Sequence, residues 1–345
     1  MEPKMIITKN NKKPARRSVD LTKTDKRYEY PFDVNALTNA YISNPYHNQC
    51  IDLKTQNIVG EGLHDKTMER LEELTPKNSA FQTLYDTIKD VLIYGNAYWE
   101  IVKVGAADYQ IFHVPAQTMK LAKDGFVQAI GEHKVEFTAD QIYHFKYSTP
   151  LSTIYGAPDY LPILPSIELF KKIIAYNDNF FANNAIPDMA MVVKGGEVAP
   201  TALYNVRSFF RDKFQGVENA HKLLYLPIRE GMEVEFKKLQ SDQKDASFME
   251  LLKQTITDII ACHGIPPRLI SIMNQGQLGG GSEVFGQMEV FYKSNIKPKQ
   301  RIIAGLLLEL NKKYHLFNDD ADFDFIPIQF TEQNNNTLED FMKRN

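Results

Sequence analysis

The chain has 345 residues, of which 43% are hydrophobic and 24% are charged, a composition that indicates a globular protein and excludes a disordered or fibrous one. The formal net charge of −3 provides no overall positive field of the kind that attracts nucleic acid. No apolar run approaches about 18 residues, so we expect no membrane span, and the amino-terminal residues lack the apolar stretch of a secretion signal.

Basic residues gather at the start of the chain. Residues 1–27 carry nine Lys or Arg side chains and three carboxylates, a net charge of +6, which leaves −9 for the remaining residues. We expect residues 1–30 to form an extended or disordered basic arm. Such an arm is either a solubilising tail or a contact to nucleic acid or to a neighbouring subunit, and composition does not separate these roles.

Capping residues and helical spacing predict the first elements. A helix is expected from Asp33 to about Ile58, closed by Gly60. Ser79-Ala80-Phe81-Gln82 has the capping-box pattern and predicts a helix that ends at Gly95. Alternating apolar residues then predict short strands at Ala97–Val104, Tyr109–Val114, Thr118–Leu121, Phe126–Ile130, Lys134–Phe137 and Ile142–Lys146. Helices followed by a meander of strands predict an α+β unit.

A Pro-rich connector from Pro150 to Pro165 leads into a helix expected from Ser166 to Asn184, with Ile167, Phe170, Ile174 and Phe181 on one stripe. The elements expected next are a strand at Met189–Val193, a helix from Pro200 to Phe214, and strands at Leu223–Leu226 and Glu233–Leu239.

A helix, a glycine-rich loop and a longer helix follow. Ser247-Phe248-Met249-Glu250 is a second capping box, and Gly264 with Pro266-Pro267 ends the helix that it begins. Glu283 begins the longer helix, which Pro298 is expected to kink. A closing strand, interrupted by Pro327, is expected at Phe325–Phe330.

The loop from Ser271 to Ser282 contains four glycines and no charged residue. Its Gly276–Gly281 spacing is that of a nucleotide-binding Walker loop, but Ser282 stands where that motif needs Lys. A mobile surface loop is the default interpretation of a glycine cluster. A third interpretation is a loop that lies near a polyanion without holding it, because each Lys–phosphate contact would add affinity and pin the polymer.

Catalytic and metal-binding patterns are sparse. The eight His residues show no ligand spacing, and we expect Cys50 and Cys262 to be buried free thiols. The sequence therefore predicts a non-enzymatic protein with no cofactor and no metal site.

Five motifs in order resemble a known family, and they lie between about residues 90 and 300. They are Tyr94-Gly95-Asn96-Ala97-Tyr98; Tyr155-Gly156-Ala157-Pro158-Asp159-Tyr160-Leu161; Phe180-Phe181-Ala182-Asn183-Asn184-Ala185-Ile186-Pro187; His263-Gly264-Ile265-Pro266-Pro267-Arg268-Leu269; and the glycine-rich loop with Phe291-Tyr292-Lys293-Ser294-Asn295-Ile296-Lys297-Pro298. With them, the chain resembles a portal protein of the tailed bacteriophages, of the PBSX/P2-like family.

The resemblance implies a portal-type fold with an α/β wing, long stem helices and a small α/β clip. Its parts would be a basic arm at 1–30, a wing at 31–158, stem helices at 159–187 and 242–263, a clip at 188–241, a tunnel loop at 264–282, a long kinked helix and closing strand at 283–330, and a short tail at 331–345 in place of a larger crown.

The resemblance also implies which residues contact DNA and the packaging motor. The DNA-facing tunnel loop would comprise Met273, Asn274, Gln275, Gly276, Gln277, Leu278, Gly279, Gly280 and Gly281. Lys171 and Lys172 would face the stem lumen. The clip would dock the packaging motor through Met189, Ala190, Met191, Val192, Arg207, Arg211 and Lys213.

The function implied is a homo-oligomeric ring, expected to be a dodecamer, at one capsid vertex in the virion, after assembly in the host cytoplasm. Double-stranded DNA would enter and leave through it without sequence-specific contacts. The implied protein partners are the large terminase subunit, the major capsid and scaffold proteins, and a head-completion protein. The alternatives are a nucleotide-binding enzyme that uses residues 276–281, and a head adaptor or scaffold protein that is not a portal.

Overall fold

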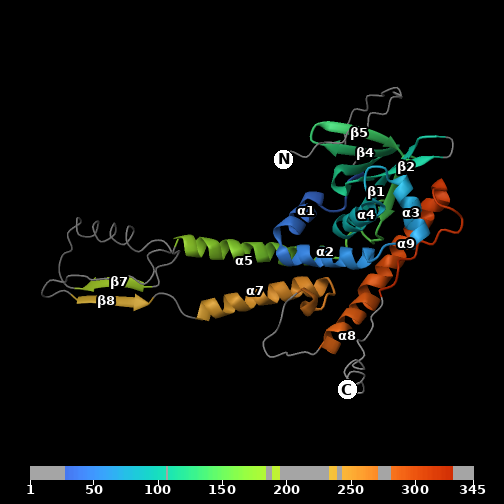
Figure 1. Ribbon diagram of the computed structural model, residues 1–345. Helices are drawn as coiled ribbons and strands as arrows, with labels where there is room; N and C mark the ends of the chain where they lie inside the picture. Colours follow the sequence, from blue (N-terminus) through green and yellow to red (C-terminus); the bar gives the residue numbers. More distant parts are fainter. Residues whose placement is uncertain are drawn as a thin grey trace, which may run out of the picture.

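The computed structural model describes residues 28–105, 108–183, 189–194, 233–238, 243–270 and 281–328. Figure 1 shows a body of helices and small sheets from which two helices, α5 (Leu164–Asn183) and α7 (Gln243–Cys262), project side by side. At the far end of this pair lies a two-stranded ribbon of β7 (Met189–Lys194) and β8 (Glu233–Lys238). The mixture of helices with small antiparallel sheets confirms the α+β class.

The first predicted helix is in fact two helices, α1 (Val34–Ser43) and α2 (Pro45–Val59). The expectation of one helix was wrong because Asn44, which precedes Pro45, is extended and cannot continue a helical turn. Its side chain accepts a hydrogen bond from the His47 amide at 2.9 Å and caps α2. A further short helix, α3 (Asp65–Leu74), was not predicted.

Helix α4 (Ala80–Tyr94) begins and ends where predicted. The Ser79 hydroxyl accepts from the Gln82 amide at 3.1 Å, but the Gln82 side chain donates to Asp86, so only half of the capping box forms. Gly95 adopts the left-handed conformation, with φ of 69°, and ends the helix.

The six predicted strands all form, in two antiparallel sheets. One sheet has the order β2-β1-β6 and the other the order β3-β4-β5. The strands are β1 (Asn96–Lys103), β2 (Tyr109–Val114), β3 (Met119–Ala122), β4 (Gly125–Ile130), β5 (His133–Thr138) and β6 (Ile142–Lys146). Trp99 on central β1 pairs with His113 and Tyr143, is fully buried, and donates its indole N–H to Thr87 on α4 at 2.6 Å. This contact joins α4 to the first sheet.

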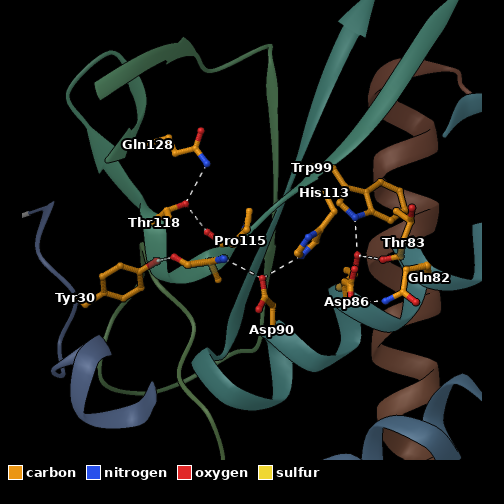
Figure 2. Close-up of polar contacts among 12 residues, drawn as sticks. Tyr30, Gln82, Thr83, Asp86, Asp90, Trp99, His113, Pro115, Thr118 and Gln128 are labelled. Atoms are coloured by element: carbon orange, nitrogen blue, oxygen red, sulfur yellow. Dashed lines mark hydrogen bonds and ion pairs between the residues drawn. The ribbon is translucent and has the colours of Figure 1, made fainter. Parts of the chain in front are cut away.

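A buried carboxylate fixes the loop between the two sheets (Figure 2). Asp90 of α4 accepts from the Ala116 amide at 2.8 Å and lies 3.0 Å from Nε2 of His113. The Tyr30 hydroxyl donates to the Ala116 and Met119 carbonyls. Its ring stacks on that of Tyr155, with the centroids 3.9 Å apart. These contacts fix the chain at Tyr30 against the second sheet.

The long carboxy-terminal helix is divided near the predicted kink. Helix α8 (Gly281–Phe291) continues as a π-helical segment (Tyr292–Ile296) and then as α9 (Lys297–Tyr314). Pro298 lies in the first turn of α9, directly after the π-helical segment, so the helix is irregular where Pro cannot donate a backbone hydrogen bond. The expected closing strand was wrong within the described residues: Phe325 makes a single bridge to Leu63, and the Ile326 amide donates to Gly62.

Two smaller expectations also change. Cys50 is buried as predicted, but Cys262 is exposed. The helix predicted at Pro200–Phe214 and the strand at Leu223–Leu226 lie outside the described residues. Among the described helices, none combines the length and apolar character that crossing a membrane requires.

Candidate stem, its root and the predicted site residues

The projecting helices α5 and α7 pack through a narrow apolar seam at the end nearer the body. Ile167 and Phe170 of α5, Ile259 of α7 and Ala40 of α1 form one buried cluster. Farther out, Tyr176 and Phe248 lie with ring centroids 5.2 Å apart. Ile173 is buried, whereas Ile174, which we expected on the inner stripe, is 45% exposed. The seam therefore joins the two projecting helices, which the resemblance assigns to a stem, and binds them to the body.

The residues predicted to contact DNA or the packaging motor lie on α5, in the terminal ribbon, at the start of α8 or outside the described residues. Lys171 and Lys172 are exposed on α5. In the terminal ribbon, Met189, Ala190, Met191 and Val192 form most of β7, where Met191 pairs with Phe236. Gly281 begins α8, so the helix starts two residues before the predicted boundary at Glu283. Met273 to Gly280, Arg207, Arg211 and Lys213 lie outside the described residues, and their roles stay predictions.

Two of the five motifs meet where the body joins α5. The Asn96 side chain donates to the Gly156 carbonyl at 2.9 Å and accepts from the Gly156 amide at 2.8 Å. Gly95 is so close to Ala157 that a methyl group at Gly95 would overlap its backbone. The Tyr160 hydroxyl donates to the Ile93 carbonyl at 2.8 Å. Glycines at 95 and 156 therefore allow two chain segments to touch through their backbones.

Two further motifs meet where α7 ends. Asn295, in the π-helical segment, donates to the His263 carbonyl at 3.0 Å. Gly264 has φ of 64°, and a side chain there would come within 2.7 Å of Asn295 Nδ2. Pro267–Ile270 forms a short 3₁₀ helix beyond this joint, and Ile270 is buried. The segment that leads into residues 271–280 is thus fixed at its start.

An ion triad lies between these two joints. Asp159, just before α5, is 2.7 Å from Lys299 Nζ of α9 and 3.7 Å from Lys54 Nζ of α2. The Lys54 side chain is 1% exposed and that of Lys299 12%. Burial lowers the pKa of Lys54, while Asp159 keeps the pKa of Lys299 raised. One carboxylate therefore compensates two largely buried cations from two different helices.

Two histidines complete the root of the stem. Nδ1 of His47 on α2 lies 2.9 Å from Nε2 of His263 at the end of α7, and both side chains are buried. Burial lowers the pKa of His47 to about 4 and that of His263 well below its ordinary value, and nearby Lys54 adds to both effects. We define the stem root as His47, Lys54, Asp159, His263 and Lys299.

The sequence contained one signal for the stem root that we missed. Lys54 occupies the same helical stripe as Cys50, Ile51 and Ile58, which are buried. A Lys on an apolar stripe predicts a buried anionic partner. Within the described residues, no cluster of His, Cys, Asp and Glu is arranged to hold a metal ion.

Comparisons with known proteins agree on one family. The family model described as phage portal protein matches residues 54–339. A protein of Haemophilus phage HP1 (strain HP1c1), named "Probable portal protein", is 23% identical over 238 residues, which cover 63% of this chain and 62% of the relative. The match thus spans less than two thirds of that relative.

Solved structures share the fold. A chain of "Virion of native gene transfer agent (GTA) particle" has a TM-score of 0.65 at 19% identity, covering 91% of this chain and 88% of that one. A chain of "Neck of native GTA particle computed with C12 symmetry" has a TM-score of 0.63 at 20% identity, covering 82% and 81%. An HK97-family phage portal protein from Corynebacterium diphtheriae has a TM-score of 0.51 at 13% identity, covering 80% and 89%.

The family model covers most of the chain, and the similar virion chain matches 91% of it. The portal-type fold that the motifs implied is therefore confirmed, and the chain belongs to the phage portal protein family.

Proposed function

We propose that identical copies of this chain form a ring at one vertex of a capsid, and that DNA enters and leaves the capsid through the ring. The family supports this role, and the similar neck structure computed with C12 symmetry supports a ring of twelve copies. The similar virion and neck chains support a place in the virion. In this proposal, the ring assembles beforehand in the host cytoplasm.

The observation that carries the proposal is the apolar surface of the projecting helices. Ile174 on α5 is 45% exposed, and Met249 and Leu251 on α7 are 51% and 42% exposed. A single chain leaves these side chains in water at an unfavourable hydration free energy. Neighbouring copies that pack head to tail would cover them, and contacts of this kind close into a ring.

DNA passage is assigned to the uncharged loop and the stem. In this proposal, Met273 to Gly281 line the narrow part of the channel and contact the duplex without holding it. Lys171 and Lys172, which are exposed on α5, would meet phosphates in the stem lumen. The contacts are electrostatic or steric and do not read the base sequence.

Docking is assigned to the terminal ribbon and the segment that follows it. The large terminase subunit and later a head-completion protein would bind there, through β7 with Arg207, Arg211 and Lys213. The body would contact the major capsid and scaffold proteins. Replacing the three basic residues with Ala should weaken terminase binding in a pull-down assay and leave the ring intact.

Ring formation is tested by native mass spectrometry and negative-stain microscopy of the purified chain. We expect a large homo-oligomer with a central channel wide enough for a duplex. A monomer or dimer over a wide range of concentrations would overturn the ring. A large assembly without a channel would favour an adaptor or scaffold protein.

The loop is tested by adding charge. Gln275→Lys combined with Gln277→Lys should slow or stall DNA packaging without changing ring assembly, because new phosphate contacts would retain the polymer. The matched control adds the same charges at Asn78 and Asn318, which are exposed on the body. Equal packaging by both variants would remove the loop from the mechanism.

A nucleotide-binding enzyme is less well supported. The loop at 276–281 lacks the phosphate-binding Lys, and the described element before it is a 3₁₀ helix, not the strand that precedes a Walker loop. Measurable binding of ATP or GTP with Mg²⁺ would favour this alternative.

A further inference from the structure

The stem root is the joint between the projecting helices and the body. His263 directly follows α7, and Asp159 precedes α5. Both are held by residues of α2 and α9, namely His47, Lys54 and Lys299. Lys299 also lies 3.4 Å from the Tyr147 hydroxyl of the wing. The orientation of both stem helices on the body therefore depends on these few contacts.

The histidine pair is incompletely hydrogen-bonded. Nε2 of His47 and Nδ1 of His263 are buried without a partner. If Nδ1–H of His47 is the donor, Nε2 of His47 is a bare acceptor and Nδ1 of His263 carries a hydrogen; the opposite tautomers exchange these roles. Either arrangement leaves one buried donor and one buried acceptor unsatisfied. Such groups are rare in folded proteins and weaken the packing that contains them.

The charges around the pair make protonation costly. Lys54 of α2 and Lys299 of α9 are positive, Asp159 before α5 is negative, and the ring of Tyr160 packs on His47 with centroids 4.4 Å apart. A first added proton binds the bare outer nitrogen and places a third positive charge beside one carboxylate. A second proton would put hydrogens on both facing nitrogens and abolish the hydrogen bond between the rings.

We propose that the stem root is an acid-sensitive latch: with both histidines neutral it holds α5 and α7 on the body, and protonation of the pair releases them. The inference concerns how the stem is held, and it stands whether or not DNA passes through a ring.

The sign and size of the effect follow from proton binding. A His whose pKa is lowered by folding binds fewer protons in the closed state, so closure is favoured above pH 6.5 and is lost as the pH falls toward 4. The pKa of His47 is about 4 in the closed state and about 6.5 in the open state, so the equilibrium constant for opening should increase about 30-fold when the pH is lowered from 7.5 to 5.

Opening is measured by amide hydrogen exchange with mass spectrometry on the full chain, corrected for the intrinsic pH dependence of exchange. Peptides from Ile256–His263 and from Asp159–Phe170 should lose protection at pH 5, while the peptide that contains Trp99 stays protected. His144, in the wing, has a pKa lowered by burial to about 3 and stays neutral at pH 5. Unchanged protection of the stem-root peptides at pH 5 would overturn the latch.

A double variant separates the pair from general acid effects. His47→Gln with His263→Gln should abolish the pH dependence of stem-root exchange, whereas His133→Gln, at an exposed position of β5, should preserve it. Persistence of the full pH dependence in the double variant would assign the effect to other groups.

A measurement on the unmodified protein covers the case in which the double variant does not fold. Deuterium exchange at the imidazole Cε1 carbon reports the protonation of each His and is read peptide by peptide. His47 and His263 should show no midpoint above pH 5, well below the ordinary histidine pKa of about 6.5. Midpoints near 6.5 for the buried pair would refute the proposal.

Discussion

Replacing Asp159 with Asn tests how much the ion triad contributes to stability. The substitution keeps the side-chain shape but removes the carboxylate that lies 3.7 Å from Lys54, whose side chain is 1% exposed. An uncompensated buried charge typically costs about 3–5 kcal/mol. Because Asp159 itself is 33% exposed, we expect a loss at the low end, about 3 kcal/mol.

The loss should also depend on pH, because Lys54 can escape the cost by releasing its proton. At pH 7, deprotonating a Lys with an ordinary pKa of about 10.4 costs about 4.6 kcal/mol, and at pH 9 only about 1.9 kcal/mol. The folded variant would bind fewer protons than the unfolded one, so its stability rises with pH. The deficit at pH 9 should therefore fall below about 2 kcal/mol.

The assay is urea unfolding, followed by the fluorescence of Trp99, the single tryptophan, which is fully buried. Asp52→Asn is the matched control, since Asp52 pairs with Lys89 at 3.0 Å with both side chains about a third exposed or less; it should cost at most about 1 kcal/mol. Adding Lys54→Met to Asp159→Asn should recover most of the loss. A deficit below about 1 kcal/mol that is equal at pH 7 and pH 9 would refute the reasoning.

Three further substitutions test other parts of the structure. Gly95→Ala should prevent stable folding or lower the free energy of unfolding in urea by more than about 2 kcal/mol, because it combines a left-handed conformation with overlap against Ala157. The control is Gly305→Ala on α9, where the added methyl group meets open space, and it should be neutral or stabilising. Ile259→Ala should remove about 2–5 kcal/mol from the packing of the stem on the body, seen as faster hydrogen exchange in α7. Ile42→Ala, at an exposed position of α1, should change this exchange little. Tyr30→Phe should cost about 1 kcal/mol and increase proteolysis near residue 28, because the hydroxyl donates to buried carbonyls; unchanged cleavage would show that ring stacking alone fixes this segment.

Helix α4 and the strands between residues 79 and 146 could be predicted from the sequence because their signals are local. The six strands alternate with period two, and the Ser79 cap and the Gly95 stop bound α4 as expected. The break at Asn44 was also encoded locally, in the residue before Pro45, but the apolar pattern of the two helices hid it. Helix α3 is short and rich in charge, and it depends on distant contacts such as the Thr67 hydroxyl donating to the Asp322 carbonyl.

The stem root could not be predicted, because its partners are far apart in the chain. His47 and His263 are separated by 216 residues, and no pattern within one segment pairs them. The family motifs identified the positions of Asp159, His263 and Asn295 without indicating what they contact. The tunnel-loop and clip assignments stay predictions, because most of those residues lie outside the described ones.

The π-helical segment Tyr292–Ile296 sets the rotational phase between α8 and α9. Each residue of an α-helix turns the chain by about 100°. The π-helical turn contains one residue more than an α-helical turn, and this extra residue changes the direction in which the side chains of α8 point relative to those of α9. With this phase, Phe291, Tyr292 and Ile296 all point inward while Asn295 reaches His263. Deleting exposed Ser294 would produce a more regular helix and yet rotate α8 by about 100° about its axis, turning its inner face away from the body. The π-helical turn therefore allows α8 and α9 to pack their buried side chains in different directions within one continuous helix.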